Sequence, residues 1–261
     1  DRERFYGDPD VIDMPTDRLL SSAFGAERRD QIDMGTAWPG MPPAGEIAGY
    51  GGASFAPHVD RSASFAAPDT SYTCTMDSAG NVCSITPSDV SFESPAIPGL
   101  GFCPSARGSQ SFAMDGHASA IAPGKRPRLT PNPAIAIQNG ERFVPLGTPG
   151  GDVQIQAMLQ TLLNLFVFGM GPQEAVEAPR FASYSFPNSF EPHDYHPGLL
   201  KMESRIDEAV GKQLAAMGHR IEWWPDVVWL AGSICMIDDN RATGLKLAGA
   251  DPRRMAYALG W

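Results

Sequence analysis

The chain has no apolar run long enough to cross a lipid bilayer. Its most apolar segment, residues 158–170 (MLQTLLNLFVFGM), is short and is interrupted by Gln160 and Asn164, which is typical of a buried helix. Basic residues are also scarce, because 20 Lys and Arg oppose 30 Asp and Glu and leave a formal charge of -10. Only residues 124–128 (GKRPR) are locally basic, whereas binding to a phosphate backbone needs a basic face. We therefore expect neither membrane insertion nor a nucleic-acid partner.

Cysteine is rare as well, and its spacing argues against two kinds of framework. The four cysteines contain no CxxC pair and are too few for a disulfide scaffold, although Cys74 and Cys83 could face each other across a hairpin. His193 and His196 are three residues apart between prolines and have no evident third ligand. The Gly-Gly pair at 150–151 is not followed by the Lys-Ser or Lys-Thr of a phosphate loop. We predict no metal site and no cofactor.

The chain does contain enough apolar material for a globular core, since 43% of its residues are hydrophobic. It starts with neither an initiator methionine nor a signal peptide, so we expect it to begin inside a longer polypeptide, and its compartment stays open between cytoplasm and periplasm. Residues 15–33 have helical spacing, with Thr16 as the N-cap. Residues 34–69 are rich in Gly and Pro without periodicity and predict a flexible linker.

Hairpins and helices account for the rest of the chain. Residues 70–87 predict a hairpin around the turn SAG, and residues 132–147 predict a second one around QNG. Asp152 is expected to cap a long buried helix. Shorter helices and strands follow at 171–179, 206–217, 219–225, 233–238 and 244–251. Because no βαβ rhythm is visible, the order predicts an α+β fold with antiparallel sheets packed against helices.

Asp69 and Thr70 stand where the linker meets the first hairpin. A threonine hydroxyl is a weak nucleophile, and most threonines at the start of a strand are structural. Cleavage of the Asp69–Thr70 bond would give Thr70 a free α-amine with a pKa of about 7.7 to 8, close to the ideal for a general base at neutral pH. Thr70 would then supply nucleophile and base together.

The segment GTPGGD, residues 147–152, offers the second part of such a site. Consecutive glycines before a helix allow backbone N–H groups to point at a developing negative charge, and the helix N-terminus adds its dipole. Gly150 and Gly151 are therefore candidates for an oxyanion hole. A plain turn is the alternative.

Several segments resemble the γ-glutamyltransferase family of N-terminal-nucleophile hydrolases in their order and spacing: YGDPDVIDMP, DTSYTCTMDSAGN, PGKRP with NPAIAI, GTPGGD, EAPRF and AGADPRRMAYALG. The resemblance covers essentially the whole chain. It implies part of an αββα sandwich, in which residues 1–69 are the tail of a large subunit and residues 70–261 are a complete small subunit. It also implies that the precursor cuts itself before Thr70, which then forms an acyl-enzyme.

The same resemblance assigns roles to further residues. Ser88 matches the family's second threonine, whose hydroxyl supports the nucleophile, and the change to serine keeps that hydroxyl. Gly150 and Gly151 match the glycines of the family's oxyanion hole. The remaining segment of the large subunit is the implied partner, and an oligomer of the heterodimer is compatible with the sequence.

The residues that should bind a glutamyl head depart from the family pattern. True γ-glutamyltransferases bind the α-amino and α-carboxylate groups with an Asn, an acidic residue and a Ser-Ser pair. The matching places here are Val90, the acid-free stretch 105–112 (SARGSQSF) and Leu129-Thr130. A buried ammonium without an acidic partner costs several kcal/mol. Arg107 is a candidate for binding an anionic acyl group, with a solvated loop arginine as the alternative.

We therefore predict an autoprocessing amidohydrolase or acylase with an N-terminal threonine, acting on a small amide whose acyl part is not glutamyl. A genuine γ-glutamyl hydrolase or transpeptidase acting on glutathione-like substrates is the enzymatic alternative. A catalytically dead homologue is the alternative of another class.

Overall fold

The structure is a computed structural model that describes residues 1–51, 70–89 and 94–261. Three short helices lie in residues 1–51: α1 (Arg2–Phe5), α2 (Thr16–Leu19) and α3 (Ser22–Arg29). The predicted single helix over 15–33 is therefore wrong. The Ser21 hydroxyl accepts a hydrogen bond from the Phe24 amide at 3.1 Å and starts a new helix there, while Thr16 is the first residue of α2 and not its cap.

The predicted first hairpin is confirmed as β1 (Thr73–Met76) and β2 (Val82–Ile85). Its register places Cys74 opposite Ser84 and Cys83 opposite Thr75, so the two cysteines do not face each other as expected. All four cysteines are free thiols. Beyond the strands, an isolated antiparallel bridge pairs Thr70 with Ser88.

A four-stranded sheet with the order β3-β4-β8-β9 lies at the centre of the fold. Its strands are β3 (Ala134–Gln138), β4 (Arg142–Gly147), β8 (Cys235–Asn240) and β9 (Leu245–Ala250), all antiparallel. The predicted QNG turn joins β3 to β4, with positive φ angles of 54° at Asn139 and 70° at Gly140. Asn-Gly is the pair that such tight hairpin turns favour.

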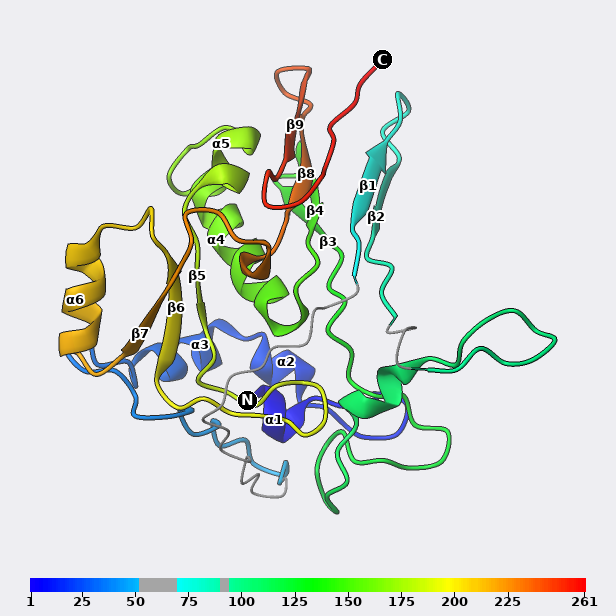
Figure 1. Cartoon of the computed structure of the whole chain (residues 1–261), viewed down its shortest axis with the longest axis vertical. Helices are drawn as coiled ribbons and strands as arrows, with labels where there is room; N and C mark the ends of the chain where they lie inside the picture. The colour runs from blue at the N-terminus through cyan, green and yellow to red at the C-terminus, as the bar shows by residue number, and fades with distance from the viewer. Residues whose placement is uncertain (52–69, 90–93) are drawn as a thin grey trace.

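Helices α4 (Gln154–Phe166) and α5 (Pro172–Glu177) pack on this sheet. The hairpin β1–β2 contacts β4 and β8 and stands across the sheet from α4 (Figure 1). The core between α4 and the sheet contains Val144, Leu146, Ala157, Met158, Leu165 and Met236. This order of helix layer, sheet and hairpin confirms the predicted α+β class and supplies three layers of the αββα sandwich.

A third sheet of order β5-β6-β7 was not expected in this form. Its strands are β5 (Phe181–Ser183), β6 (Leu199–Glu203) and β7 (Arg220–Trp224). β6 and β7 are parallel and are joined by α6 (Glu208–Ala216), so the chain contains one βαβ unit where none was predicted. Every residue of β6 is buried, and its side chains show no polar alternation that would have revealed it.

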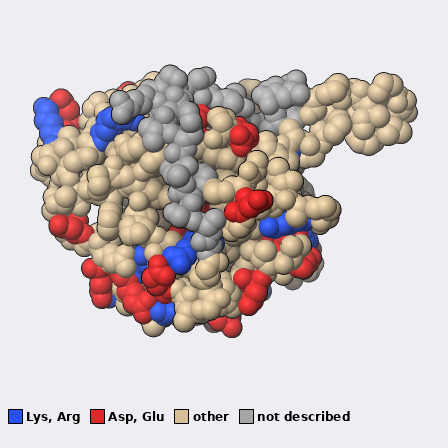
Figure 2. Space-filling view, turned by 90° about the horizontal axis from the view of Figure 1, so that it is seen from below, with Lys and Arg blue, Asp and Glu red and all other residues tan. Residues whose placement is uncertain are grey.

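The expectations drawn from composition concerned membrane insertion and nucleic-acid binding. None of the helices in the described part of the chain has the length and apolar character needed to span a bilayer. On the face shown in Figure 2, Lys and Arg side chains stand among Asp and Glu rather than forming a continuous basic surface.

Candidate active site

Thr70 lies at the entrance to the β1–β2 hairpin with its side chain buried. The bridge to Ser88 is supported by a hydrogen bond from the Ser71 amide to the Pro87 carbonyl at 3.0 Å. This pairing brings the Thr70 Oγ1 to 2.6 Å from the Ser88 Oγ. The expected contact between the two hydroxyls is therefore present, and it rests on rigid antiparallel backbone.

Arg107 contacts this hydroxyl pair from a separate element, the short 3-10 helix η1 (Ala106–Gln110). Its guanidinium donates a hydrogen bond to the Ser88 Oγ. It also donates to the Gln110 Oε1 at 3.2 Å and the Thr130 Oγ1 at 3.4 Å, and it lies 5.4 Å from the centre of the Phe190 ring. Arg107 is only 8% exposed, so it is not the solvated loop arginine that the sequence left open.

The donor and acceptor roles in this chain of contacts follow from the side-chain chemistry. A guanidinium can only donate, so the Ser88 Oγ must be the acceptor of the Arg107 bond. The hydroxyl proton of Ser88 then remains available for Thr70 Oγ1, or Ser88 accepts a second bond from the Thr70 hydroxyl. In either case Arg107 orients the hydroxyl that contacts Thr70.

Gly150 and Gly151 form the bend before α4, with φ angles of 134° and 54°. Most side chains would be strained at these angles, so the bend explains both glycines. The Gly150 carbonyl accepts from the Val153 amide at 3.0 Å, and no amide hydrogen bond from either glycine to another described residue is present. That state is compatible with the expected oxyanion hole. Whether the two amides face Thr70 stays a prediction.

Neighbouring contacts fix this glycine bend close to the hairpin. A Cβ placed on Gly147 would come within 2.3 Å of the Tyr72 ring, so the end of β4 packs directly on the residue two positions after Thr70. The Thr148 Oγ1 donates to the Pro149 carbonyl at 2.7 Å and accepts from the Ser233 amide at 2.7 Å. The Thr148 side chain thus fixes the backbone just before the bend.

The helix cap expected at Asp152 is absent. α4 begins after Val153 without a side-chain cap, because the Asp152 carboxylate is used elsewhere. It accepts from the Ser189 amide and from the Ser189 hydroxyl, both at 2.7 Å, and it forms an ion pair with Arg2. Asp152 therefore ties the glycine bend to α1 and to the 188–196 loop.

Arg254 reaches Thr70 from the C-terminal segment, and sequence reasoning missed it. Its Nη1 donates to the Thr70 carbonyl oxygen at 3.1 Å. The guanidinium also lies 5.2 Å from the centre of the Trp229 ring, which belongs to the 3-10 helix η3 (Trp229–Ala231). The neighbouring arginines of PRR in the ending AGADPRRMAYALG were the only signal available in the sequence.

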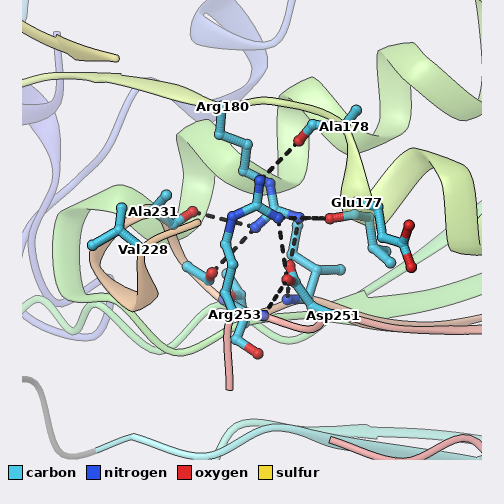
Figure 3. A network of polar contacts seen from close by, with 12 residues as sticks. Glu177, Ala178, Arg180, Val228, Ala231, Asp251 and Arg253 are labelled. Atoms are coloured by element: carbon cyan, nitrogen blue, oxygen red, sulfur yellow. Dashed lines mark hydrogen bonds and ion pairs between the residues drawn. The ribbon is translucent and has the colours of Figure 1, made fainter. Parts of the chain in front are cut away.

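Arg180, Asp251 and Arg253 lie together in a buried ion cluster (Figure 3), to which Glu203 also belongs. Arg253 forms ion pairs with Glu203 at 2.6 Å and with Asp251 at 3.1 Å, and Arg180 pairs with Asp251 at 2.6 Å. Burial lowers the pKa of Arg180 to about 10, which leaves it charged at neutral pH. Burial opposes ionisation of Glu203, but the hydrogen bonds and charge of Arg253 outweigh it and hold the pKa of Glu203 below its usual value.

The remaining predicted residues have mixed outcomes. Asp69 and Val90 lie outside the described residues. Leu129 is 53% exposed, whereas its neighbour Thr130 contacts Arg107. His193 stacks on Phe112 at a ring distance of 3.7 Å, and within residues 1–51, 70–89 and 94–261 no three His, Cys, Asp or Glu side chains are grouped to hold a metal ion.

The chain is similar to known proteins over its whole length. The family model described as Gamma-glutamyltranspeptidase matches residues 1–261. The Acylase ACY 1 proenzyme of Pseudomonas sp. (strain SE83) is 30% identical over 264 residues, covering 100% of this chain and 42% of the relative. The solved structure of LmbA2991HD is 31% identical with a TM-score of 0.89, covering 100% of this chain and 46% of that one. The chain thus spans less than half the length of both.

A further solved structure, the T380A mutant of the Helicobacter pylori γ-glutamyltranspeptidase, matches in a different way. It is 26% identical with a TM-score of 0.58, and the match covers 70% of this chain but 99% of the solved chain. A separate chain in that structure therefore corresponds to only part of the present one.

Proposed function

Because the chain belongs to the γ-glutamyltranspeptidase family, we propose that it forms part of an autoprocessing amidohydrolase or acylase whose nucleophile is Thr70. The observation that carries this proposal is the 2.6 Å contact between the Thr70 Oγ1 and the Ser88 Oγ, with Arg107 donating to the same Ser88 oxygen. A threonine present only for its β-propensity would not need a second hydroxyl held in place by a buried arginine.

The precursor is first cut between Asp69 and Thr70. In this step the Thr70 Oγ1 attacks the carbonyl carbon of Asp69, the peptide C–N bond breaks, and an ester links Asp69 to the Thr70 side chain. Water then hydrolyses the ester, leaving a carboxylate on Asp69 and a free α-amine on Thr70. That amine has a pKa of about 7.7 to 8 when unperturbed and serves as the general base in later turnovers.

The size of a related chain supports this cleavage point. The match to the Helicobacter pylori enzyme covers 70% of the 261 residues, which is about 180 residues and nearly all of that solved chain. The segment from Thr70 to Trp261 has a similar length. We accordingly assign residues 1–69 to the tail of a large subunit and residues 70–261 to the catalytic small subunit.

Turnover follows the same chemistry on an external amide. The Thr70 α-amine takes the hydroxyl proton as Oγ1 attacks the substrate carbonyl, and the amine leaving group departs with that proton. Ser88 stabilises Oγ1 by hydrogen bonding, and the amides of Gly150 and Gly151 bind the oxyanion. Water then releases the acid from the acyl-enzyme and restores Thr70.

The acyl group is proposed to be something other than glutamyl. Val90, Leu129 and the acid-free stretch around Arg107 provide no carboxylate for a substrate ammonium at the places where the family binds it. A related protein that is 30% identical is named an acylase, which is compatible with this choice. We propose an acyl chain ending in a carboxylate, which would approach Arg107 and Thr130 beside Ser88.

The rest of the precursor is the proposed partner, and the outer face of α4 is its proposed contact surface. Ile155, Leu159 and Leu163 of α4 and Val167, the residue directly after it, repeat every four residues and are 41 to 65% exposed, forming the α4 outer stripe. Related proenzymes are more than twice as long as this chain, so a large segment is available to cover the stripe.

Substituting Leu159 and Leu163 by Gln in the full precursor should release the upstream fragment during purification, whereas Leu20→Gln, at an isolated exposed leucine, should retain it. Retention of the fragment with loss of a homodimer would assign the stripe to a second copy and overturn this contact.

Denaturing electrophoresis of the full precursor tests the proposed function. The native protein should run as two fragments and hydrolyse amides, and Thr70→Ala should remain a single inactive chain. Thr70→Ser keeps a hydroxyl and should still be cut, while Thr73→Ala alters an exposed threonine of the same hairpin and should behave like the native protein. Efficient processing of Thr70→Ala would contradict the assignment.

A further inference from the structure

Two adjacent arginines of the C-terminal segment point to different parts of the molecule. Arg253 is completely buried in the ion cluster, where its Nε and Nη2 contact Glu203 at 2.7 and 2.6 Å and its Nη1 donates to the Val176 carbonyl at 2.8 Å. Arg254, the next residue, is half-buried and donates to the Thr70 carbonyl at 3.1 Å. Arg253 thus anchors the backbone from which Arg254 reaches the nucleophile.

The position of the Arg254 guanidinium is defined on a second side. Trp229 lies beneath it, with 5.2 Å between the guanidinium carbon and the ring centre. Trp229 begins η3, which ends at Ala231, and a Cβ placed on the following residue, Gly232, would come within 2.9 Å of the Thr148 Oγ1. The residues that hold Arg254 therefore also pack on the segment that leads to Gly150.

This geometry places a permanent positive charge beside the main chain of Thr70. The α-nitrogen and the carbonyl oxygen of one residue are about 3 Å apart, so the guanidinium lies within about 6 Å of the Thr70 nitrogen. A like charge at that range disfavours the ammonium form and favours the neutral amine. Only the neutral amine can accept the hydroxyl proton.

We propose that Arg254 is a positioning residue that holds the Thr70 backbone through its carbonyl and keeps the released Thr70 α-amine neutral at physiological pH. This inference rests on the proposed N-terminal threonine mechanism. It adds a role for a residue 184 positions away from Thr70 in the sequence. Loss of the charge should raise the pKa of the α-amine by about one unit.

The other charged and titratable groups around Thr70 do not obscure the effect of the Arg254 charge on the pKa of the α-amine. Arg107 acts through Ser88 and remains charged, and Asp89 accepts a bond from the Ser105 hydroxyl at 3.1 Å. Burial raises the pKa of Tyr72 and raises that of Cys74 to about 11, so both stay neutral near pH 7. Burial also raises the pKa of Cys235.

The test is the pH dependence of kcat/KM for the processed, full-length enzyme and its Arg254→Gln and Arg254→Lys variants. Arg254→Gln should move the acidic limb upward by about one pH unit, and Arg254→Lys, which keeps the charge, should leave it in place while lowering the rate. Arg241→Gln is the matched control, because Arg241 also donates to a carbonyl, that of Gly80 at 3.1 Å, and lies over Phe143. An unchanged limb in Arg254→Gln would overturn the proposal.

A second measurement applies if Arg254→Gln fails to process. In the native enzyme the acidic limb of the kcat/KM profile should move upward by a few tenths of a pH unit between low ionic strength and about 1 M salt. At about 1 M salt the Debye length is only about 3 Å, so the Arg254 charge is screened from the Thr70 α-amine. A limb that is insensitive to salt would contradict the charge effect. Failure of the native precursor to process would instead count against the proposed function itself.

Discussion

Arg107 and Arg253 are both buried, but they make different kinds of contact. Arg253 pairs with the carboxylates of Glu203 and Asp251 and with backbone carbonyls. Arg107 donates to the hydroxyls of Ser88 and Thr130 and to the Gln110 amide oxygen. The carboxylates around Arg253 neutralise its charge. The contacts of Arg107 instead orient small neutral groups next to Thr70.

The comparison separates what stabilises the fold from what prepares the site. A buried ion pair is retained at a large desolvation cost, so breaking it leaves an uncompensated charge and destabilises the protein. A hydroxyl held by an arginine contributes little to stability, because a typical hydrogen bond is worth about 1 kcal/mol. Substitutions in the ion cluster should therefore act on folding, and substitutions around Ser88 should act on rate.

The largest effect is expected for Glu203→Gln, which leaves Arg253 without its 2.6 Å partner. The free energy of unfolding should fall by about 3 to 5 kcal/mol in denaturant titrations of the processed enzyme. Glu208→Gln, which removes the exposed partner of the exposed Lys212, should cost less than about 1 kcal/mol. A loss for Glu203→Gln as small as that of the control would break the comparison.

The same variant should also change how the free energy of unfolding depends on pH. The folded-state pKa of Glu203 lies below its usual value, so its contribution is present above the unfolded pKa and is lost as pH falls through the folded pKa. Glu203→Gln should therefore flatten the acid limb of the stability profile. An acid limb as steep as that of the native protein would contradict this account of the cluster.

The second-largest effect is expected in kcat/KM when the acyl group of the substrate is changed. A glutamyl head would bring an ammonium to the places held by Leu129, Val90 and the stretch around Arg107, where the sequence provides no acid. We expect glutaryl-p-nitroanilide to exceed γ-glutamyl-p-nitroanilide in kcat/KM by at least about a hundredfold, equivalent to roughly 3 kcal/mol in transition-state binding. Competition kinetics on the processed enzyme measure the ratio. Equal turnover would mean that the upstream part of the protein supplies the missing acid.

The smallest effect is expected for Ser88→Ala. It removes one hydrogen bond to the Thr70 Oγ1, so processing and turnover should slow by roughly five- to tenfold, about 1 kcal/mol or a little more, with little change in stability. Ser84→Ala removes a comparable hydroxyl pair, that with Tyr72 at 2.7 Å, and should leave the rate nearly unchanged. Identical rates for Ser88→Ala and the native enzyme would remove Ser88 from the site.

The sequence predicted those parts of the site that are local. The hairpins, the Asn139-Gly140 turn and the glycine bend depend on neighbouring residues, and the structure contains all of them. The contact of Thr70 with Ser88 follows from the register of the first hairpin. Family resemblance named Ser88 because it matches the place of the family's second threonine, and its supporting role stays a prediction.

The parts that were missed depend on contacts between distant segments. Arg254 contacts Thr70 because the segment that follows β9 brings it to the start of the first hairpin, 184 positions away in the sequence. The strand β6 is buried along its whole length, so it lacks the alternation that marks a half-buried strand. The break at Ser21 was decided by one side-chain cap inside a stretch whose apolar spacing continued.

Mass spectrometry of the processed, full-length enzyme during turnover of glutaryl-p-nitroanilide tests the central claim most directly. The small fragment should begin with Thr70, and rapid acid quenching should trap a glutaryl group on the peptide that contains this residue. Thr70→Ala should give neither the fragment nor the adduct. A fragment that begins at another residue, or an adduct on another side chain, would contradict the assignment of Thr70 as the nucleophile.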